Sequence, residues 1–219
     1  MILTTKNLAH WYTDESSKLY SDVNLTFGSN KFYAIIGESG SGKTTILSFL
    51  AGLDVPRAGE IAIDGVSINK IGLTKYRQRY VATIFQSYNL LTSMTAYQNI
   101  ETALAITRSS HKGDRQYILE QLARVGINQA QAFKNVHKLS GGEQQRIAIV
   151  RALLVDAPIV AADEATGNLD HENSRVIVNL FKELAHDYGK TVILITHDRE
   201  IAKEADVQIE LKDRQFTVL

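Results

Sequence analysis

A glycine-rich stretch in the N-terminal half has the composition of a phosphate-binding loop. It reads Gly37-Glu38-Ser39-Gly40-Ser41-Gly42-Lys43-Thr44 and fits the pattern G-x-x-x-x-G-K-[ST]. Its glycines let backbone N–H groups surround phosphate oxygens, Lys43 can meet the β and γ oxygens, and Thr44 can offer its hydroxyl to Mg²⁺. Because only about one chain of this length in a hundred matches by chance, we set aside an ordinary glycine turn. Thr45 opens the helical run that follows and is included in the expected nucleotide site.

Two acidic residues follow an apolar run in Pro158-Ile159-Val160-Ala161-Ala162-Asp163-Glu164. The run is typical of a buried strand, and an open parallel sheet presents its chemistry at the carboxyl ends of its strands. We expect Asp163 to bind Mg²⁺ and Glu164 to act as the general base that deprotonates the attacking water. An Asp-Glu pair alone is more often a solvated loop. The phosphate loop upstream and the helical run from about Asp170 favour the catalytic interpretation.

Two further apolar runs each lead to one polar side chain. Thr191–Ile195 leads to His197, and Val81–Phe85 leads to Gln86. His197 can hydrogen-bond a γ-phosphate, and Gln86 occupies the equivalent place after its own run. A lone histidine after a strand is more often structural, and a lone glutamine carries no signal. Both interpretations therefore depend on these residues lying beside the other strand ends.

These residues need an α/β framework to bring them together. Short runs rich in β-formers alternate with longer helical runs, which predicts a mostly parallel sheet. The first thirty residues and the alternating segment Glu60–Gly65 predict a small antiparallel layer beside it. Helical periodicity from Thr95, with Gly126 as a stop, predicts an inserted helical lobe over about 87–154 within a single domain spanning 1–219. The predicted strands of the main sheet are Phe32–Ile36, Val81–Phe85, Ile159–Ala162, Thr191–Ile195 and Val207–Leu211.

The composition excludes several classes of protein. Lys plus Arg equals Asp plus Glu at 24 each, so no net positive field favours nonspecific binding to nucleic acid or to an anionic membrane. There is no cysteine, which excludes disulfides, thiolate catalysis and cysteine zinc sites and fits a reducing compartment. No run approaches the length of a transmembrane helix, and the start lacks a secretory core. We expect a cytoplasmic chain without a transmembrane segment.

The segment Leu139-Ser140-Gly141-Gly142-Glu143-Gln144-Gln145-Arg146 resembles the signature sequence of ABC ATPases. Ser140, Gly141 and Gly142 would begin a helix and form a second phosphate-binding N-terminus. The resemblance runs from about Leu3 and implies the ABC ATPase fold, a phosphate-loop NTPase core with a small antiparallel subdomain and an inserted helical subdomain. It also implies hydrolysis of ATP with Mg²⁺. In this family two subunits pack head to tail, so each signature closes over the other subunit's ATP, and we expect a homodimer.

The resemblance also implies roles for single residues. Tyr12 matches the aromatic that stacks on adenine, although an aromatic beside Trp11 near a strand end is often a core residue. Gln86 matches the loop that senses Mg²⁺ and the membrane partner, Asp170 the loop that crosses the dimer, and His197 the switch histidine. A membrane permease is expected to dock near Gln86 and the helical lobe, at the cytoplasmic face of the membrane. No nucleic-acid partner is expected.

Two strings resemble the lipoprotein-release and macrolide-exporter branch of the family. They are Phe85-Gln86-Ser87-Tyr88-Asn89-Leu90-Leu91 and Thr166-Gly167-Asn168-Leu169-Asp170. The branch implies export or extraction of a peptide, a lipid-like molecule or a drug-like molecule. Ala165 stands where that branch usually has proline, so the loop lacks a fixed φ, and alanine there also resembles amino-acid importers. In this family the permease forms the pathway, so neither substrate nor direction is encoded in this chain.

Three other classes of protein share part of this pattern with a transport ATPase. A force-transmitting ATPase resembling the cell-division ABC pair would share all these features, and only its membrane partner would separate the two. Soluble ABC ATPases that act on DNA or ribosomes typically carry a long coiled-coil insertion, zinc-binding cysteines or a second ATPase domain, for which this chain has no room. Small-molecule kinases and GTPases share the phosphate loop but give no reason for residues 139–146.

Overall fold

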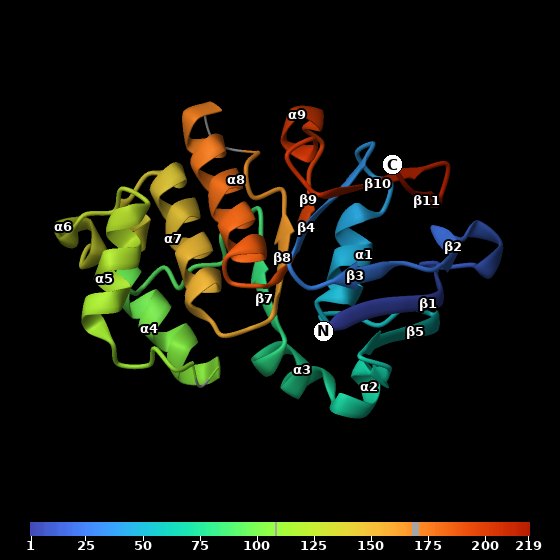
Figure 1. Cartoon of the computed structure of the whole chain (residues 1–219), viewed down its shortest axis with the longest axis horizontal. Helices are drawn as coiled ribbons and strands as arrows, with labels where there is room; N and C mark the ends of the chain where they lie inside the picture. Colours follow the sequence, from blue (N-terminus) through green and yellow to red (C-terminus); the bar gives the residue numbers. More distant parts are fainter. Residues whose placement is uncertain (108, 168–170) are drawn as a thin grey trace.

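A mostly parallel sheet forms the centre of the molecule (Figure 1). The structure is a computed structural model that describes residues 1–107, 109–167 and 171–219, without the side chains of 171–173. In the described chain the main sheet has the order β11-β10-β4-β9-β8-β7, and all neighbours pair in parallel except β11 and β10. The strands are β4 Lys31–Gly37, β7 Val81–Ile84, β8 Ile159–Asp163, β9 Thr191–Ile195, β10 Val207–Lys212 and β11 Gln215–Val218.

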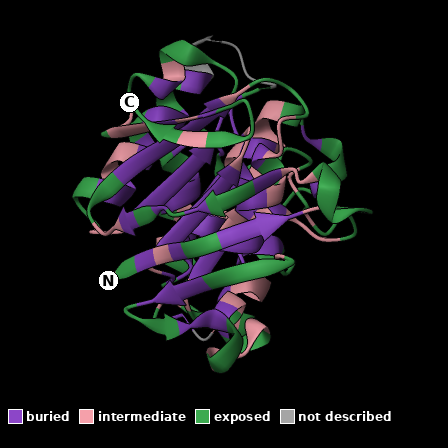
Figure 2. Cartoon of the chain, turned by 90° about the vertical axis from the view of Figure 1, so that its right-hand side faces the viewer, coloured by how far each residue is buried: buried purple, intermediate pink, exposed green. Residues whose placement is uncertain are grey.

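The five strands predicted from apolar runs are confirmed. Strand β7 ends at Ile84 rather than Phe85, because the chain turns away from the sheet where the Phe85 carbonyl accepts the Tyr88 N–H at 3.0 Å. Strand β11 has no counterpart in the prediction. The central strands of the sheet are buried on both faces (Figure 2), which explains why they read as continuous apolar runs.

A second, antiparallel sheet has the order β2-β1-β5-β6, with β3 also paired to β1, and confirms the predicted antiparallel layer. Its strands are β1 Ile2–His10, β2 Tyr20–Val23, β3 Thr26–Gly28, β5 Ala58–Ile63 and β6 Val66–Ser67. The β1–β5 register shifts between Lys6 and Ala9. Gly59 faces this bulge with φ 85°, and a Cβ there would lie 2.4 Å from Leu8 Cα, so only glycine fits.

The helical lobe is inserted between β7 and β8 and lies on the left of Figure 1, away from the antiparallel sheet. It contains α4 Ala96–Thr107, α5 Arg115–Arg124, α6 Gln129–Ala132, the 3₁₀ turn η2 Val136–Lys138 and α7 Gly141–Leu154. Gly126 follows α5 with φ 75°, which confirms the predicted stop. The other helices are η1 Glu15–Ser17, α1 Lys43–Leu50, α2 Ile68–Ile71, α3 Leu73–Arg79, α8 His171–His186 and α9 Arg199–Ala202.

Two apolar clusters hold these layers together. Phe32, Val160 and Val192 face the cluster shared with α7, α8 and the helical lobe. Their sequence neighbours point the opposite way, into the cluster shared with α1 and the antiparallel sheet. Among the described residues, none of the helices combines the length and the apolar character that crossing a bilayer requires.

Candidate active site

The phosphate loop connects β4 to α1. Gly37 is required by packing, because a Cβ there would lie 2.5 Å from the Leu211 carbonyl oxygen. Gly40 and Gly42 have φ of 77° and 105°, which glycine adopts without strain. Gly42 is the N-cap of α1 and offers no side chain to the free N–H groups of the first turn. The start of α1 can therefore bind an anion.

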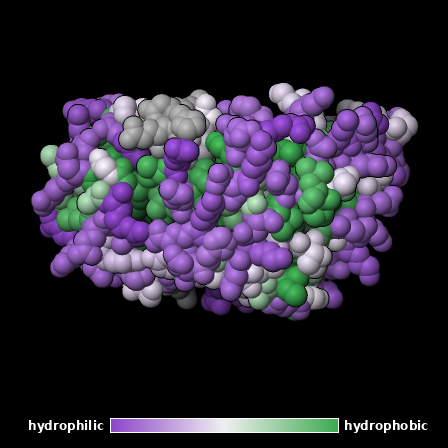
Figure 3. Space-filling view, turned by 45° about the horizontal axis from the view of Figure 1, so that its top comes forward, coloured by the Kyte–Doolittle hydropathy of each residue, from purple (hydrophilic) through white to green (hydrophobic). Residues whose placement is uncertain are grey.

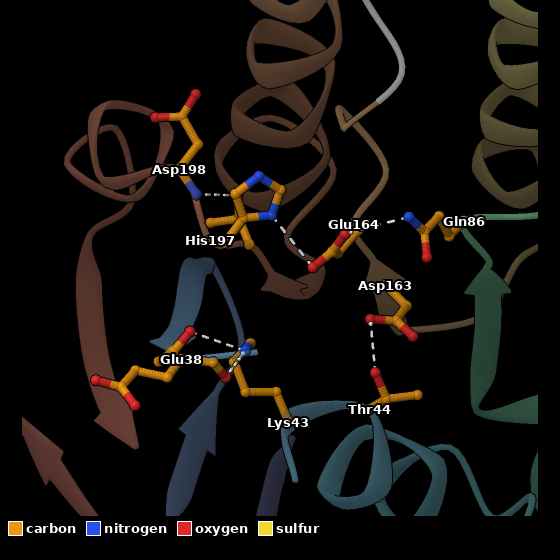
Figure 4. A network of polar contacts seen from close by, with 10 residues as sticks. Glu38, Lys43, Thr44, Gln86, Asp163, Glu164, His197 and Asp198 are labelled. Atoms are coloured by element: carbon orange, nitrogen blue, oxygen red, sulfur yellow. Dashed lines mark hydrogen bonds and ion pairs between the residues drawn. The ribbon is translucent and has the colours of Figure 1, made fainter. Parts of the chain in front are cut away.

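Lys43 is folded back onto this loop (Figure 4). Its Nζ donates to the Gly37 carbonyl at 2.8 Å and to the Glu38 carbonyl at 2.7 Å, and the side chain is buried. Burial lowers the pKa of Lys43, and the nearby Glu164 and Asp163 carboxylates oppose that shift. The Glu38 carboxylate points away from the lysine. Among the described residues the ammonium donates its hydrogen bonds to neutral carbonyls, so an incoming phosphate would give it an anionic hydrogen-bond partner.

The two acids lie where β8 ends, beside the phosphate loop. Thr44 Oγ1 donates to Asp163 Oδ1 at 3.3 Å, and burial raises the pKa of Asp163. Glu164 has φ 45°, an unusual left-handed conformation for a non-glycine residue, and its N–H donates to the Ile195 carbonyl of β9. The side chain of Glu164 is 25% exposed. Its carboxylate is therefore fixed by the backbone and remains accessible to a ligand.

Gln86 and His197 contact opposite oxygens of the Glu164 carboxylate. Gln86 Nε2 donates to Oε2 at 3.3 Å, and His197 Nδ1 lies 3.2 Å from Oε1 (Figure 4). Gln86 follows β7 and His197 follows β9, the two strands that flank β8 in the sheet. The sheet order thus brings together three polar side chains that are far apart in the sequence.

Tyr12 lies on the other side of the phosphate loop, after the end of β1. It is 64% exposed, so the alternative that it is a core residue is wrong. Its hydroxyl lies 2.8 Å from Thr45 Oγ1. An exposed aromatic ring is thus tied to the first turn of the phosphate-binding helix.

The segment Ser140-Gly141-Gly142 lies apart from these groups, at the start of α7, which Figure 1 draws on the far side of α8 from α1. Ser140 is the N-cap: its Oγ accepts the Glu143 N–H at 3.3 Å, and Glu143 Oε2 accepts the Ser140 N–H at 2.6 Å. This capping box fixes the helix start. The predicted Asp170 lies outside the described residues.

Sequence reasoning missed two residues of α7. Gln145 is buried and donates its Nε2 to the carbonyl of Ala165, the residue after Glu164. Arg151 donates to the carbonyls of Tyr88 at 3.1 Å and Asn89 at 2.6 Å, just beyond Gln86. Arg151 lies within the apolar run 147–154, and Gln145 lies two residues before it. A polar residue in such a place signals a buried and hydrogen-bonded group.

Ala165 is fully buried, and its N–H has no acceptor among the described residues. A position whose N–H makes no hydrogen bond is one that proline can occupy without losing one. The hydrogen bonding of this N–H is therefore compatible with the proline that the lipoprotein-release and macrolide-exporter branch usually has here. Alanine, unlike proline, does not fix φ at this position.

Comparison with known proteins gives one consistent result. The ABC transporter family model matches residues 20–167. The chain is 49% identical to the ABC transporter ATP-binding protein YclH of Bacillus subtilis, over 99% of this chain and 96% of YclH. It is 36% identical to the lipoprotein-releasing system ATP-binding protein LolD of Francisella tularensis, over 100% of this chain and 97% of LolD. It is 37% identical to the macrolide export ATP-binding/permease protein MacB of Hyphomonas neptunium, over 97% of this chain but only 33% of MacB.

Solved structures agree with these relatives. The dimeric structure of the ABC transporter cassette MJ0796, from Methanocaldococcus jannaschii, superposes with a TM-score of 0.89 at 36% identity, over 98% of this chain and 96% of that one. A post-hydrolysis state of MJ0796 bound to ADP and Pi also gives a TM-score of 0.89, at 35% identity, over 99% and 97% of the two chains. The predicted α/β fold with an antiparallel subdomain and an inserted helical subdomain is confirmed. The chain belongs to the ABC transporter family, as an ATP-binding subunit with ATPase activity.

Proposed function

We propose that two copies of this chain bind ATP head to tail, hydrolyse it with Glu164 as general base, and so drive a membrane permease that exports or extracts its substrate. One observation carries this proposal: the sheet gathers Lys43, Asp163 and Glu164 at one edge and leaves Ser140 at a separate helix start. The same chain thus holds a complete phosphate site and a second anion-binding helix start that this site does not use. The phosphate site of a second copy would use this helix start.

ATP would bind with its phosphates in the loop 37–45, and Lys43 would exchange the two loop carbonyls for β and γ oxygens. The Thr44 hydroxyl and Asp163 carboxylate lie 3.3 Å apart and are oxygen donors of the kind Mg²⁺ binds, so the residues present fit this ion. The side-chain oxygen of Gln86 would be the third protein ligand of Mg²⁺. When bound, Mg²⁺ neutralises phosphate charge during transfer.

Glu164 would take a proton from water while the water oxygen forms a bond to the γ-phosphorus. The bond from that phosphorus to the bridging oxygen then breaks, which leaves ADP and phosphate. Gln86 and His197 hold the two carboxylate oxygens in place, 3.3 Å and 3.2 Å away. His197 would turn to the γ-phosphate once ATP arrives. Lys43 balances the charge that develops.

The second copy would dock on the face at the top of Figure 1, where α9 and the carboxyl ends of the strands lie. Figure 3 shows this face as mostly hydrophilic, with apolar side chains in recesses between polar ones. Such a surface suits a dimer that ATP closes and hydrolysis reopens. Asp170 would cross this interface, and Tyr12 would stack on adenine. The permease would dock near Gln86 and the helical lobe, at the cytoplasmic face of the membrane.

The relatives support a role in export or extraction. LolD is named for lipoprotein release and MacB for macrolide export, and both match almost the whole of this chain. The MacB name joins an ATP-binding part to a permease part, and this chain aligns with one third of that protein. We therefore propose that the 1–219 segment acts as a single ATPase domain that a permease complements.

The test is the size and nucleotide content of the Glu164→Gln variant with Mg-ATP, measured by light scattering after gel filtration. The amide cannot accept the water's proton, so we expect a dimer with one ATP per chain and loss of at least about a hundredfold in kcat. Glu60→Gln makes the same change at an exposed residue of β5, in the antiparallel sheet, and should behave as wild type. Unchanged hydrolysis by Glu164→Gln would show that Glu164 is not the general base. A monomer in Mg-ATP would contradict the shared site.

A further inference from the structure

His10 is a buried polar residue whose ring nitrogens have no partner. It is the last residue of β1 and is 6% exposed, and neither Nδ1 nor Nε2 has a hydrogen bond within the described part of the chain. A buried polar group without a partner opposes folding, and phenylalanine would fill the same space without that cost. The imidazole therefore calls for an explanation other than packing.

The ring of His10 supports the ring of Tyr12. The two lie edge to face with centroids 5.0 Å apart at 87°, and the other side of His10 rests on Phe49 of α1, with centroids 4.9 Å apart. The hydroxyl of Tyr12 is held by Thr45 of the same helix. A largely exposed ring is thus fixed at both ends, next to the phosphate loop. Adenine would meet a ring that has little rotational freedom left to lose.

Few charges face His10. Burial lowers the pKa of the imidazole, the Asp54 carboxylate opposes that shift, and the Arg57 guanidinium adds to it. Tyr20 is paired with His10 across β1 and β2, and burial raises the pKa of its phenol. His10 is therefore neutral near pH 7. An imidazolium formed in acid would be buried without a hydrogen-bond partner and would be drawn toward Asp54 or water.

We propose that His10 is a positioning residue for Tyr12, and that protonation of His10 displaces the Tyr12 ring, so that nucleotide binding weakens in mild acid. The inference rests on the proposed stacking of Tyr12 on adenine. It assigns to the imidazole a property that phenylalanine lacks, the ability to take up a proton. Because His10 touches no phosphate, its effect falls on binding rather than on the chemical step.

The experiment is calorimetric titration with Mg-ADP, which binds without being hydrolysed, from about pH 7.5 to about pH 5.5. Wild type and His10→Phe are compared at each pH, because the titration of ADP itself is common to both. We expect the Kd of wild type to rise about fivefold more than that of His10→Phe over this range. Equal changes of Kd with pH in wild type and His10→Phe would overturn the proposal. His10→Phe should also melt at a higher temperature than wild type, since the unpaired nitrogens are gone.

Tyr12→Ala separates failure of this inference from failure of the proposed site. It should raise the Kd for Mg-ADP at about pH 7.5 and remove the extra pH dependence. If Tyr12→Ala leaves the Kd unchanged, adenine stacking is wrong and the inference falls with it. If Tyr12→Ala weakens binding but wild type and His10→Phe stay parallel, only the role of His10 is wrong. His10→Ala gives the complementary readout, a raised KM for ATP with kcat retained.

Discussion

Lys43 and Lys190 carry ammonium groups whose hydrogen bonds, among the described residues, go to backbone carbonyls. Lys43 donates to Gly37 and Glu38 in the phosphate loop, and Lys190 donates to Val155 at 2.9 Å and Leu153 at 3.4 Å, at the end of α7. Burial lowers both pKa values. For Lys43 an incoming phosphate can supply the counter-charge. Lys190 lies away from the nucleotide, so its burial should be visible in stability alone.

Burial lowers the pKa of Lys190 to about 8. Between about pH 8 and the ordinary lysine pKa near 10.4, the unfolded chain holds a proton that the folded chain has released, so the free energy of unfolding rises with pH across this window. We expect wild type to gain about 1–3 kcal/mol relative to Lys190→Met between about pH 7 and pH 9.5, in urea titrations. A neutral amine still donates to both carbonyls, so the contact survives. Parallel stability curves would contradict the shift.

At the scale of elements, hydrophobic periodicity predicted the buried strands, but it missed a strand that depends on a turn. Thr191–Ile195 is apolar throughout because β9 is covered on both faces, and the prediction matches its bounds. Strand β11 is mostly exposed, and its four residues, Gln215–Val218, are too few to give a clear pattern. It forms because Asp213 and Arg214 both adopt left-handed φ, 49° and 65°, in the turn from β10. Such turns are usually recognised by Asn-Gly or Asp-Gly, and this one contains no glycine.

Helix α7 is joined to the loop that contains Gln86. Arg151 donates to the carbonyls of Tyr88 and Asn89, two consecutive residues with left-handed φ of 61° and 45°. At the other end of α7, the Tyr88 hydroxyl lies 3.1 Å from the position a Cβ on Gly141 would take. The loop thus contacts both the start and the body of the helix. Movement of either element should move the other.

Arg151→Met should release the loop while leaving the helix folded. Without the two guanidinium bonds the left-handed residues lose their main tertiary support, so we expect the amides of Tyr88 and Asn89 to exchange about tenfold faster in hydrogen–deuterium measurements. Arg124→Met is the matched control, because that guanidinium pairs with Glu183 on a partly exposed surface. Arg124→Met should leave the exchange rates of the Tyr88 and Asn89 amides unchanged. Equal exchange in wild type and Arg151→Met would mean that Arg151 does not hold the loop.

For the molecule as a whole, the sequence predicted which strands end in polar residues but not how the strands are ordered. The order β4-β9-β8-β7 places Gln86 and His197 on either side of Glu164, and nothing local to those residues specifies it. The contact of Lys43 with its own loop could not be predicted either, because the pattern of the loop does not say which carbonyls the ammonium meets. Ser140 stays outside this cluster in one chain. Whether Ser140 acts on ATP therefore has to be tested with two chains.

Mixing two inactive variants tests whether the site is shared between chains. Lys43→Ala disables the phosphate loop, and Ser140→Arg blocks the signature and removes an N-cap worth about 1 kcal/mol. A head-to-tail heterodimer of the two contains one site in which both parts are intact. If one intact site suffices for turnover, an equimolar mixture should recover up to about a quarter of wild-type ATPase activity, although each variant alone is inactive.

The matched control places both substitutions in one chain and mixes it with wild type. Every heterodimer then has one site without a phosphate loop and one without a signature, so activity should come only from wild-type pairs. A site built within a single chain would give no recovery in the first mixture, because each chain would still lack one of its own parts. Recovery in the first mixture, with about a quarter rather than about half of wild-type activity in the second, would therefore require that Lys43 of one copy and Ser140 of another act on the same ATP.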